Sequence, residues 1–240
     1  MNLMSESNRL QKADKHLFRN ELKYVCTEGE LQQIAMRIKP ICLIDKHALH
    51  QGTYQIRSVY FDDPQDNSLS ENEAGIDPRE KFRIRIYDAD PSYITLECKH
   101  KEHAMTRKES CRITYGQSLQ ILHHQFYPDE TAPPLLKRFS IQMHERRLRP
   151  KVIVLYERTP FVYRAGNVRI TLDRNISSSS HIEAFFDPYI PARPIMPTGK
   201  HVLEVKYDAF LPDYLYRMMN LGSLRQSAFS KYALCRKFTL

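Results

Sequence analysis

The segment Lys81-Phe82-Arg83-Ile84-Arg85-Ile86-Tyr87 alternates between cationic and apolar side chains. In a β-strand successive side chains point to opposite faces, so Lys81, Arg83 and Arg85 share one face and the apolar residues share the other. One strand of this kind is typical of an ordinary sheet with a solvated face. The same polarity returns in other segments, and a sheet whose polar faces converge would enclose a positively charged cavity.

Five further segments carry a polar face opposite an apolar one. The members of these faces are Arg19, Glu21 and Lys23; Thr95, Glu97 and Lys99; Lys108, Ser110 and Arg112; Arg169, Thr171 and Asp173; and Glu204 and Lys206. Arginine and lysine at this density suit the binding of phosphate groups, for which arginine offers paired donors. The carboxylates of Glu97, Asp173 and Glu204 are candidate ligands for Mg²⁺ or Mn²⁺.

Charge and cysteine usage narrow the class of protein. The 240 residues carry a formal net charge of +8, which favours anionic partners such as nucleic acid, phosphorylated metabolites or an anionic membrane surface. The five cysteines form no C-x-x-C pair, which argues against a disulfide framework or a structural zinc site. No apolar run is long enough for a transmembrane segment, so the sequence predicts a cytoplasmic protein.

The order of expected elements predicts an α+β fold. We expect an antiparallel, closed or nearly closed barrel with helices packed outside it. A polar segment, residues 1–15, is expected to be flexible, and residues 16–240 to form a single domain. The expected strands are 18–25, 54–62, 81–87, 93–99, 108–115, 151–158, 161–164, 168–173 and 201–207, and the expected helices are 28–38, 118–124, 134–147, 212–221 and 227–238. Prolines at 188, 191, 194 and 197 predict an extended connection.

The common nucleotide-binding loops are missing from the sequence. Neither G-x-x-x-x-G-K-[ST] nor a G-x-G-x-x-G following a strand occurs, and seven glycines leave little material for such a loop. If this chain binds phosphates, side chains must hold them. Nucleic acid is the least favoured partner, because the cations lie singly on strands rather than beside exposed aromatic residues that would stack bases.

Eight short motifs in order resemble the VTC domain, the catalytic domain of vacuolar transporter chaperone polyphosphate polymerases and their bacterial relatives. They are Glu21-Leu22-Lys23-Tyr24, Arg57-Ser58-Val59-Tyr60-Phe61-Asp62, Lys81-Phe82-Arg83-Ile84-Arg85, Leu96-Glu97-Cys98-Lys99, Tyr156-Glu157-Arg158, Val168-Arg169-Ile170-Thr171-Leu172-Asp173, Leu203-Glu204-Val205-Lys206 and Phe229-Ser230-Lys231-Tyr232. The similarity spans residues 16 to 236. It implies a triphosphate tunnel metalloenzyme fold, a closed antiparallel barrel of eight strands whose basic interior binds a triphosphate.

The resemblance also implies roles for individual residues. Lys23, Arg83, Arg85, Lys99, Arg158 and Arg169 would be catalytic, and Glu204 would bind Mn²⁺ or Mg²⁺. The substrate-binding residues would be Lys108, Lys206, Ser230 and Lys231, with Glu21 and Glu97 supporting the metal or pairing with neighbouring cations. The implied partners are ATP, triphosphate and inorganic polyphosphate, with a membrane partner protein as a further possibility.

The first strand departs from the pattern of the hydrolases and cyclases in this superfamily. Those proteins resemble one another in a Glu-x-Glu-x-Lys motif, where this chain has Arg19-x-Glu21-x-Lys23. Hydrolysis needs a water molecule to be deprotonated, whereas the end of a phosphate chain is already an anionic nucleophile. We therefore expect a polyphosphate polymerase that uses ATP. The alternatives left open are a triphosphatase and a module that binds polyphosphate without turnover.

Overall fold

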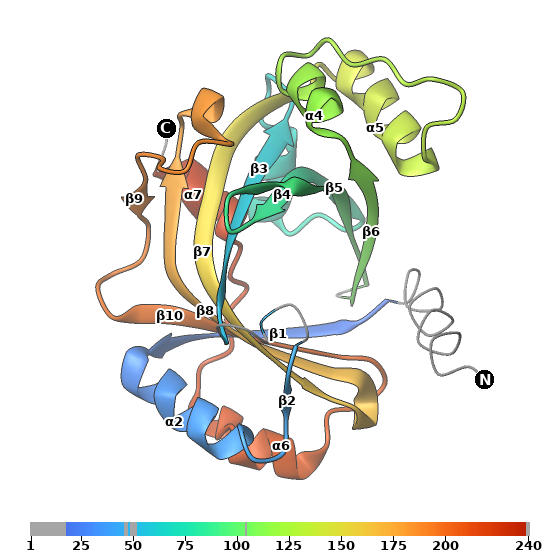
Figure 1. Ribbon diagram of the computed structural model, residues 1–240. Coiled ribbons are helices and arrows are strands. Elements are labelled where there is room, and N and C mark those ends of the chain that lie inside the picture. The colour runs from blue at the N-terminus through green and yellow to red at the C-terminus, as the bar shows by residue number, and fades with distance from the viewer. Residues whose placement is uncertain (1–17, 46–47, 49–51, 104, 239–240) are drawn as a thin grey trace, which may run out of the picture.

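An antiparallel sheet that curls into a half-barrel forms most of the protein (Figure 1). The computed structural model describes residues 18–45, 48, 52–103 and 105–238; the segment 1–15, expected to be flexible, lies outside them. Neighbouring strands along the sheet are β1 (Asn20–Thr27), β10 (Lys200–Tyr207), β8 (Val168–Ser179), β7 (Arg149–Tyr163), β3 (Tyr54–Asp62), β4 (Arg79–Tyr87), β5 (Asp90–Glu102) and β6 (Met105–Ile113). Two short strands extend it, β2 (Leu43–Ile44) beside β7 and β9 (Arg193–Pro194) beside β8.

The sheet is not the closed barrel that the sequence predicted. Within the described residues, the two edge strands β1 and β6 meet through one isolated bridge, between Arg19, just before β1, and Thr106; its backbone hydrogen bonds measure 2.9 and 3.0 Å. Closure needs a complete ladder between the first and last strands. Further along β1, its unpaired edge is covered by residues 226–227 of the C-terminal segment. Tyr24 forms a β-bridge with Gln226, and the Ser227 N–H donates to the Lys23 carbonyl over 2.9 Å. The fold is therefore a half-barrel with its eight strands in antiparallel order.

Four helices cover the convex face of the sheet, as expected. The helices α2 (Glu28–Ile38) and α6 (Asp213–Met218) pack on β1, β10 and β8, where Leu31 and Ile34 meet Leu203 in one apolar core. The helices α4 (Tyr115–Leu122) and α5 (Pro134–Glu145) pack on β4 and β5, where Phe139 meets Leu96. The predicted capping box begins α2: the Thr27 side chain accepts from the Glu30 N–H, and the Glu30 carboxylate accepts from the Thr27 N–H.

A fifth helix, α7 (Lys231–Lys237), lies on the concave face instead, contrary to the expectation that all helices pack outside. Its Tyr232 and Ala233 pack in one apolar core with Ile56 and Val154. Along their strands these two residues alternate with residues that point to the convex face, so they themselves point to the concave face. The Tyr232 hydroxyl donates to Asp62 over 2.5 Å. The same carboxylate accepts from the first turn of α3 (Asn67–Ala74), so that α3, α7 and the end of β3 are tied together.

Smaller differences from the sequence prediction concern connections. The segments 151–158 and 161–164 belong to one continuous strand, β7. Pro160 lies within it, beyond the point where the pairing of β7 with β3 ends. Its missing N–H therefore breaks no hydrogen bond to β3, and its carbonyl accepts from the Asp45 N–H on the same side. Within the proline-containing connection, Arg193 and Pro194 pair with β8. Short 3₁₀ helices complete the connections at η2 (Ala165–Asn167), η3 (Ile182–Ala184) and η4 (Leu221–Ser223). None of the helices within the described ranges is long and apolar enough to cross a membrane.

Candidate functional site

The concave face of the half-barrel concentrates charge. Alternation along each strand turns the predicted polar faces inward, while their apolar partners form the convex cores. We call the charged part of this face the interior. Its ion pairs join the cations Lys23, Arg83, Arg85, Lys99, Lys108, Arg158, Lys206 and Lys231 to the carboxylates Glu21, Glu97, Asp173 and Glu204.

Glu97 on β5 holds the first group of cations. Its carboxylate lies 2.6 Å from Arg83 Nη2, 3.6 Å from Arg85 Nη1 and 3.0 Å from Lys108 Nζ. Register explains the grouping, because Glu97 is directly opposite Arg83 on the neighbouring strand β4. Burial alone would raise the pKa of Glu97, but Arg85, Lys108 and Arg83 hold it well below its usual range. Glu97 is therefore a buried carboxylate, 2% exposed, that three cations share.

A second group forms where β1 pairs with β10. Register places Glu21 opposite Lys206 and Lys23 opposite Glu204. Glu21 accepts from Lys99 on β5 at 2.7 Å and lies 3.3 Å from Lys206, so it spans the space between β1 and β5. Burial opposes ionisation of Glu21, yet Lys23, Lys99 and Lys206 together lower its pKa.

Glu204 belongs to the same group and is the predicted metal ligand. Its carboxylate lies 2.6 Å from Lys206 Nζ and 3.7 Å from Lys231 Nζ. Burial would raise the pKa of Glu204, but Lys206, Lys231 and other nearby cations hold it well below its ordinary value. Glu204 and Glu21 are close enough to repel each other. The two carboxylates therefore form one anionic centre that lysines neutralise.

Asp173 links β8 to the last helix. Arg158 donates to both of its oxygens, at 2.7 and 2.8 Å, and Lys231 Nζ lies 2.7 Å away. Against the effect of burial, Arg158 and Lys231 lower the pKa of Asp173, and Asp173 in turn raises the pKa of Lys231 although burial opposes this. Lys231 thus brings the C-terminal segment into the interior, next to both Asp173 and Glu204.

Two predicted residues lie at the margin of these groups. Arg169 shares the inward face of β8 but pairs with Asp45 at 3.0 Å, on the connection that follows β2, rather than with an interior carboxylate. Ser230 is the N-cap of α7, where its hydroxyl accepts from the Ala233 N–H, and it also lies 3.4 Å from Lys81 Nζ. The structure places both at the edge of the interior.

Three neutral polar residues complete the site and were missed from the sequence. The Tyr60 hydroxyl accepts from Arg83 at 2.7 Å, while Ser58 and Tyr156 accept from Arg85 at 3.0 and 3.3 Å. Strand alternation could have found them, because Ser58 and Tyr60 share one face of β3 and Tyr156 shares a face of β7 with Arg158. They fix the orientation of both guanidinium groups without neutralising them.

A model of the VTC domain family matches residues 18–240. The chain belongs to this family. Among solved structures, a candidate adenylate cyclase from Bacillus halodurans is similar with a TM-score of 0.51 and 12% identity, over 87% of this chain and 90% of that one. A candidate adenylyl cyclase from Hippeastrum, described as having a dominant triphosphatase activity, has a TM-score of 0.50 and 14% identity, over 93% and 96%.

Both neighbours are similar in fold to this VTC domain over most of their length. At these identities the likeness concerns the fold alone. A comparison with curated proteins found no match.

Two interior carboxylates of this VTC domain could together hold a metal ion whose remaining ligands come from elsewhere. In the described ranges, no group of three or more His, Cys, Asp or Glu side chains could hold a metal ion alone. Magnesium and similar ions commonly take one or two carboxylates and complete their shell with substrate phosphates and water. Glu204 and Glu21 supply the two carboxylates, so the donor set fits that mode.

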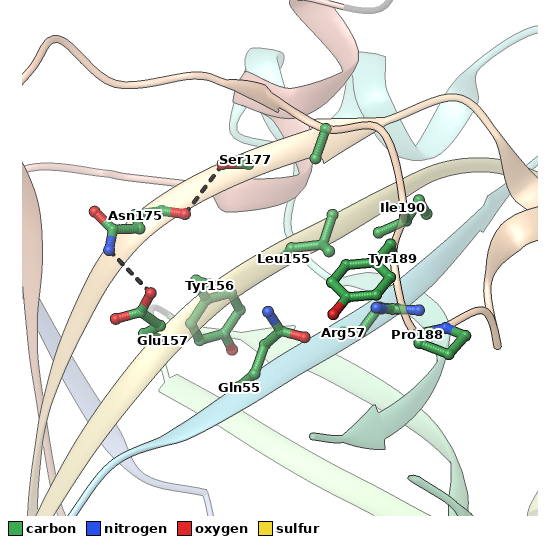
Figure 2. A pocket seen from close by; sticks show the side chains of 11 residues that line it. Gln55, Arg57, Leu155, Tyr156, Glu157, Asn175, Ser177, Pro188, Tyr189 and Ile190 are labelled. Atoms are coloured by element: carbon green, nitrogen blue, oxygen red, sulfur yellow. Dashed lines mark hydrogen bonds between the residues drawn. The ribbon is translucent and has the colours of Figure 1, made fainter. Parts of the chain in front are cut away.

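A separate pocket of about 290 Å³ lies on the convex side of β3 and β7 (Figure 2). Arg57 lines it and is only 1% exposed. Its guanidinium donates to the carbonyls of Phe185 at 2.8 Å and Asp187 at 2.6 Å, and burial lowers its pKa. In the VTC domain Arg57 therefore fastens the connection that follows β8 to the sheet, on the side opposite the interior.

Proposed function

We propose that this VTC domain is a polyphosphate polymerase. It would transfer the γ-phosphoryl group of ATP to the terminal phosphate of an inorganic polyphosphate chain. The terminal oxygen forms the new phosphoanhydride bond as the bond between the β- and γ-phosphates breaks, and ADP leaves. The observation that carries the proposal is that all four interior carboxylates are held ionised by cations.

The balance of interior charge favours a polyanion as substrate. Eight cations pair with four carboxylates, so positive charge remains that a ligand must neutralise. The cations come from six strands and the last helix, and they surround the interior rather than lying on one flat patch. A chain of phosphates, with charge along its whole length, is the ligand class that this distribution matches.

The state of the carboxylates favours phosphate transfer over hydrolysis. A general base works best with a pKa near the operating pH, whereas cations lower the pKa of Glu21 and Glu204 despite burial. Arg19 takes the position of the first glutamate in the Glu-x-Glu-x-Lys motif of the hydrolases. It lies 2.8 Å from Asp208 and adds no carboxylate to the interior. A phosphate chain end needs alignment and charge neutralisation rather than deprotonation.

The residues would share this work. Arg83 and Arg85 would bind phosphate oxygens, with Tyr60, Ser58 and Tyr156 fixing their orientation. Arg158 and Lys231 would neutralise charge on the transferring group, and Lys99, Lys108 and Lys206 would hold the chain. Mn²⁺ or Mg²⁺ held by Glu204, with Glu21, would supply Lewis-acid neutralisation of the triphosphate.

An assay of products tests the proposal. We would incubate the protein with ATP and Mn²⁺, stain a polyacrylamide gel for polyphosphate, and measure ADP and free phosphate. Long chains with matching ADP are expected. Free phosphate without chains would replace the proposal by a triphosphatase, and unchanged ATP with tight triphosphate binding would replace it by a binding module.

The metal assignment has its own test in the same assay. Glu204→Gln should abolish metal-dependent turnover, because the anionic ligand is lost without a change of shape. The matched control is Glu183→Gln, at an exposed glutamate whose carboxylate pairs with His181. Full activity of the Glu204→Gln protein would show that Glu204 does not hold the metal.

A further inference from the structure

Lys81 lies in a row of lysines on the inward face of three neighbouring strands. Register places Lys81 of β4 directly opposite Lys99 of β5, and Lys99 directly opposite Lys108 of β6. Like charges in directly opposite positions destabilise a sheet. Lys99 and Lys108 each have a compensating carboxylate, Glu21 and Glu97 respectively. The third member of the row has none.

The contacts of Lys81 are with neutral groups. Its Nζ donates to the Asn72 side chain, lies 3.4 Å from Ser230 Oγ and sits 5.3 Å from the centre of the Tyr232 ring. Among the described residues, no carboxylate oxygen lies within 4.0 Å of Lys81 Nζ. By contrast, each lysine and arginine to which the family resemblance gives a role has a carboxylate oxygen within 4.0 Å. Lys81 is therefore a largely buried amine whose charged form has no paired carboxylate among the described residues.

The surroundings of Lys81 are predominantly cationic. Burial, followed by Lys99, Arg79 and Lys23, lowers its pKa to about 7. Asp62 opposes this, but Tyr232 and the first turn of α3 already engage its oxygens. Charged groups on the elements around it include Arg79 and Arg83 on β4, Lys99 and Lys101 on β5, Lys23 on β1, Asp62 on β3, Glu71 and Glu73 on α3, and Lys231, Arg236 and Lys237 on α7.

We propose that Lys81, with the hydroxyl of Ser230, forms a phosphate-binding subsite for the polyanionic substrate. The proposal deepens the proposed function and rests on it for the class of ligand. A phosphate oxygen would supply the anion that the row of lysines lacks, and Ser230 would add a neutral donor beside it. Lys81 is partly exposed, so a ligand can reach it from solvent.

Binding at this subsite should be accompanied by uptake of a proton. In the empty protein at pH 8, Lys81 is mostly neutral because its pKa is about 7. A bound phosphate favours the charged form and restores the ammonium. The wild-type protein should therefore take up close to one proton at this residue when a polyphosphate binds.

Calorimetric titration with inorganic triphosphate tests the subsite. The titration is done at pH 8 with EDTA in buffers of different ionisation enthalpy, which gives both the Kd and the number of protons taken up. Lys81→Met should weaken binding about tenfold and lower the proton uptake by close to one proton. Uptake at Lys99, whose pKa burial also lowers to about 7, should remain. Lys81→Arg should keep most of the affinity but lower the uptake by the same amount as Lys81→Met, because a guanidinium stays protonated.

Lys237→Met is the matched control, since it removes the same charge at an exposed residue of α7 that pairs with Glu73. It should bind triphosphate and take up protons like the wild type. The proposal is overturned if Lys81→Met behaves like Lys237→Met, or if the folded wild type does not bind triphosphate. Binding that depends on Lys81 in a protein that makes no polyphosphate would retain the subsite and refute the polymerase.

Discussion

Replacing Glu97 by Gln should test whether interior ion pairs hold the half-barrel together. The carboxylate is 2% exposed and contacts Arg83, Arg85 and Lys108. The amide keeps the shape but leaves three cations without their anion. Removing one partner of a buried pair commonly costs about 3–5 kcal/mol. Lys108 is half exposed, so most of that loss should come from the two arginines.

Urea and thermal unfolding measure the loss. At about 2–4 °C per kcal/mol for a chain of this size, Tm should fall by roughly 6–20 °C at pH 7. The folded-state pKa of Glu97 lies well below its unfolded value. The stabilisation by Glu97 is therefore complete above the unfolded pKa and disappears as pH falls through the folded one. The difference between the two proteins should shrink in acid.

Added triphosphate gives the prediction a second, independent readout. Phosphate oxygens can take the place of Glu97, so the ligand should stabilise the Glu97→Gln protein more than the wild type. Glu183→Gln serves as the control because its glutamate is exposed. A loss below about 1 kcal/mol at pH 7, the range of surface pairs, would refute the claim that this group stabilises the fold.

Three further changes probe other parts of the molecule. Lys81→Met should stabilise the empty protein by roughly 1–3 kcal/mol at pH 6, because it removes a charge that burial disfavours. This range is smaller than the full pKa shift implies, since Lys81 is partly exposed to solvent. The gain should vanish towards pH 10, because the folded pKa of about 7 is below the unfolded one and wild-type stability rises between them; a constant gain would contradict this. Arg57→Met should cost roughly 1.5–3 kcal/mol in urea unfolding through lost charged hydrogen bonds, without changing the Kd for triphosphate. Thr27→Ala should cost about 1 kcal/mol by removing the cap of α2, and unchanged urea unfolding would contradict that.

The sequence predicts those features that depend on alternation and capping. The helix 28–38 and the strand 54–62 occur at their predicted bounds, because Thr27 and Glu30 form a local capping box and the strand is a long β-branched and aromatic run. The inward direction of Arg83, Glu97 and Lys206 follows from alternation alone. These are local properties, which one segment determines without reference to the others.

The remaining features depend on contacts between distant segments. Nothing local to β1 shows that Gln226 and Ser227 take its free edge and keep it from β6. The position of α7 on the concave face likewise depends on the fit of Tyr232 against residues more than seventy positions away. Arg169 has the correct parity, but only the fold brings Asp45 within reach of it.

The pairing of β1 with β10 has a consequence for synthesis of the protein. Glu21 and Lys23 lie on the first strand, their partners Lys206 and Glu204 on the last, and Lys231 follows later still. During translation the early strands β3, β4 and β5 can pair as soon as they emerge, since they are neighbours in the sheet. The first strand must wait until β10 has left the ribosome. A nascent chain therefore carries its cationic strands before it has an interior to enclose them, and the centre formed by Glu21 and Glu204 is assembled only after β10 has emerged.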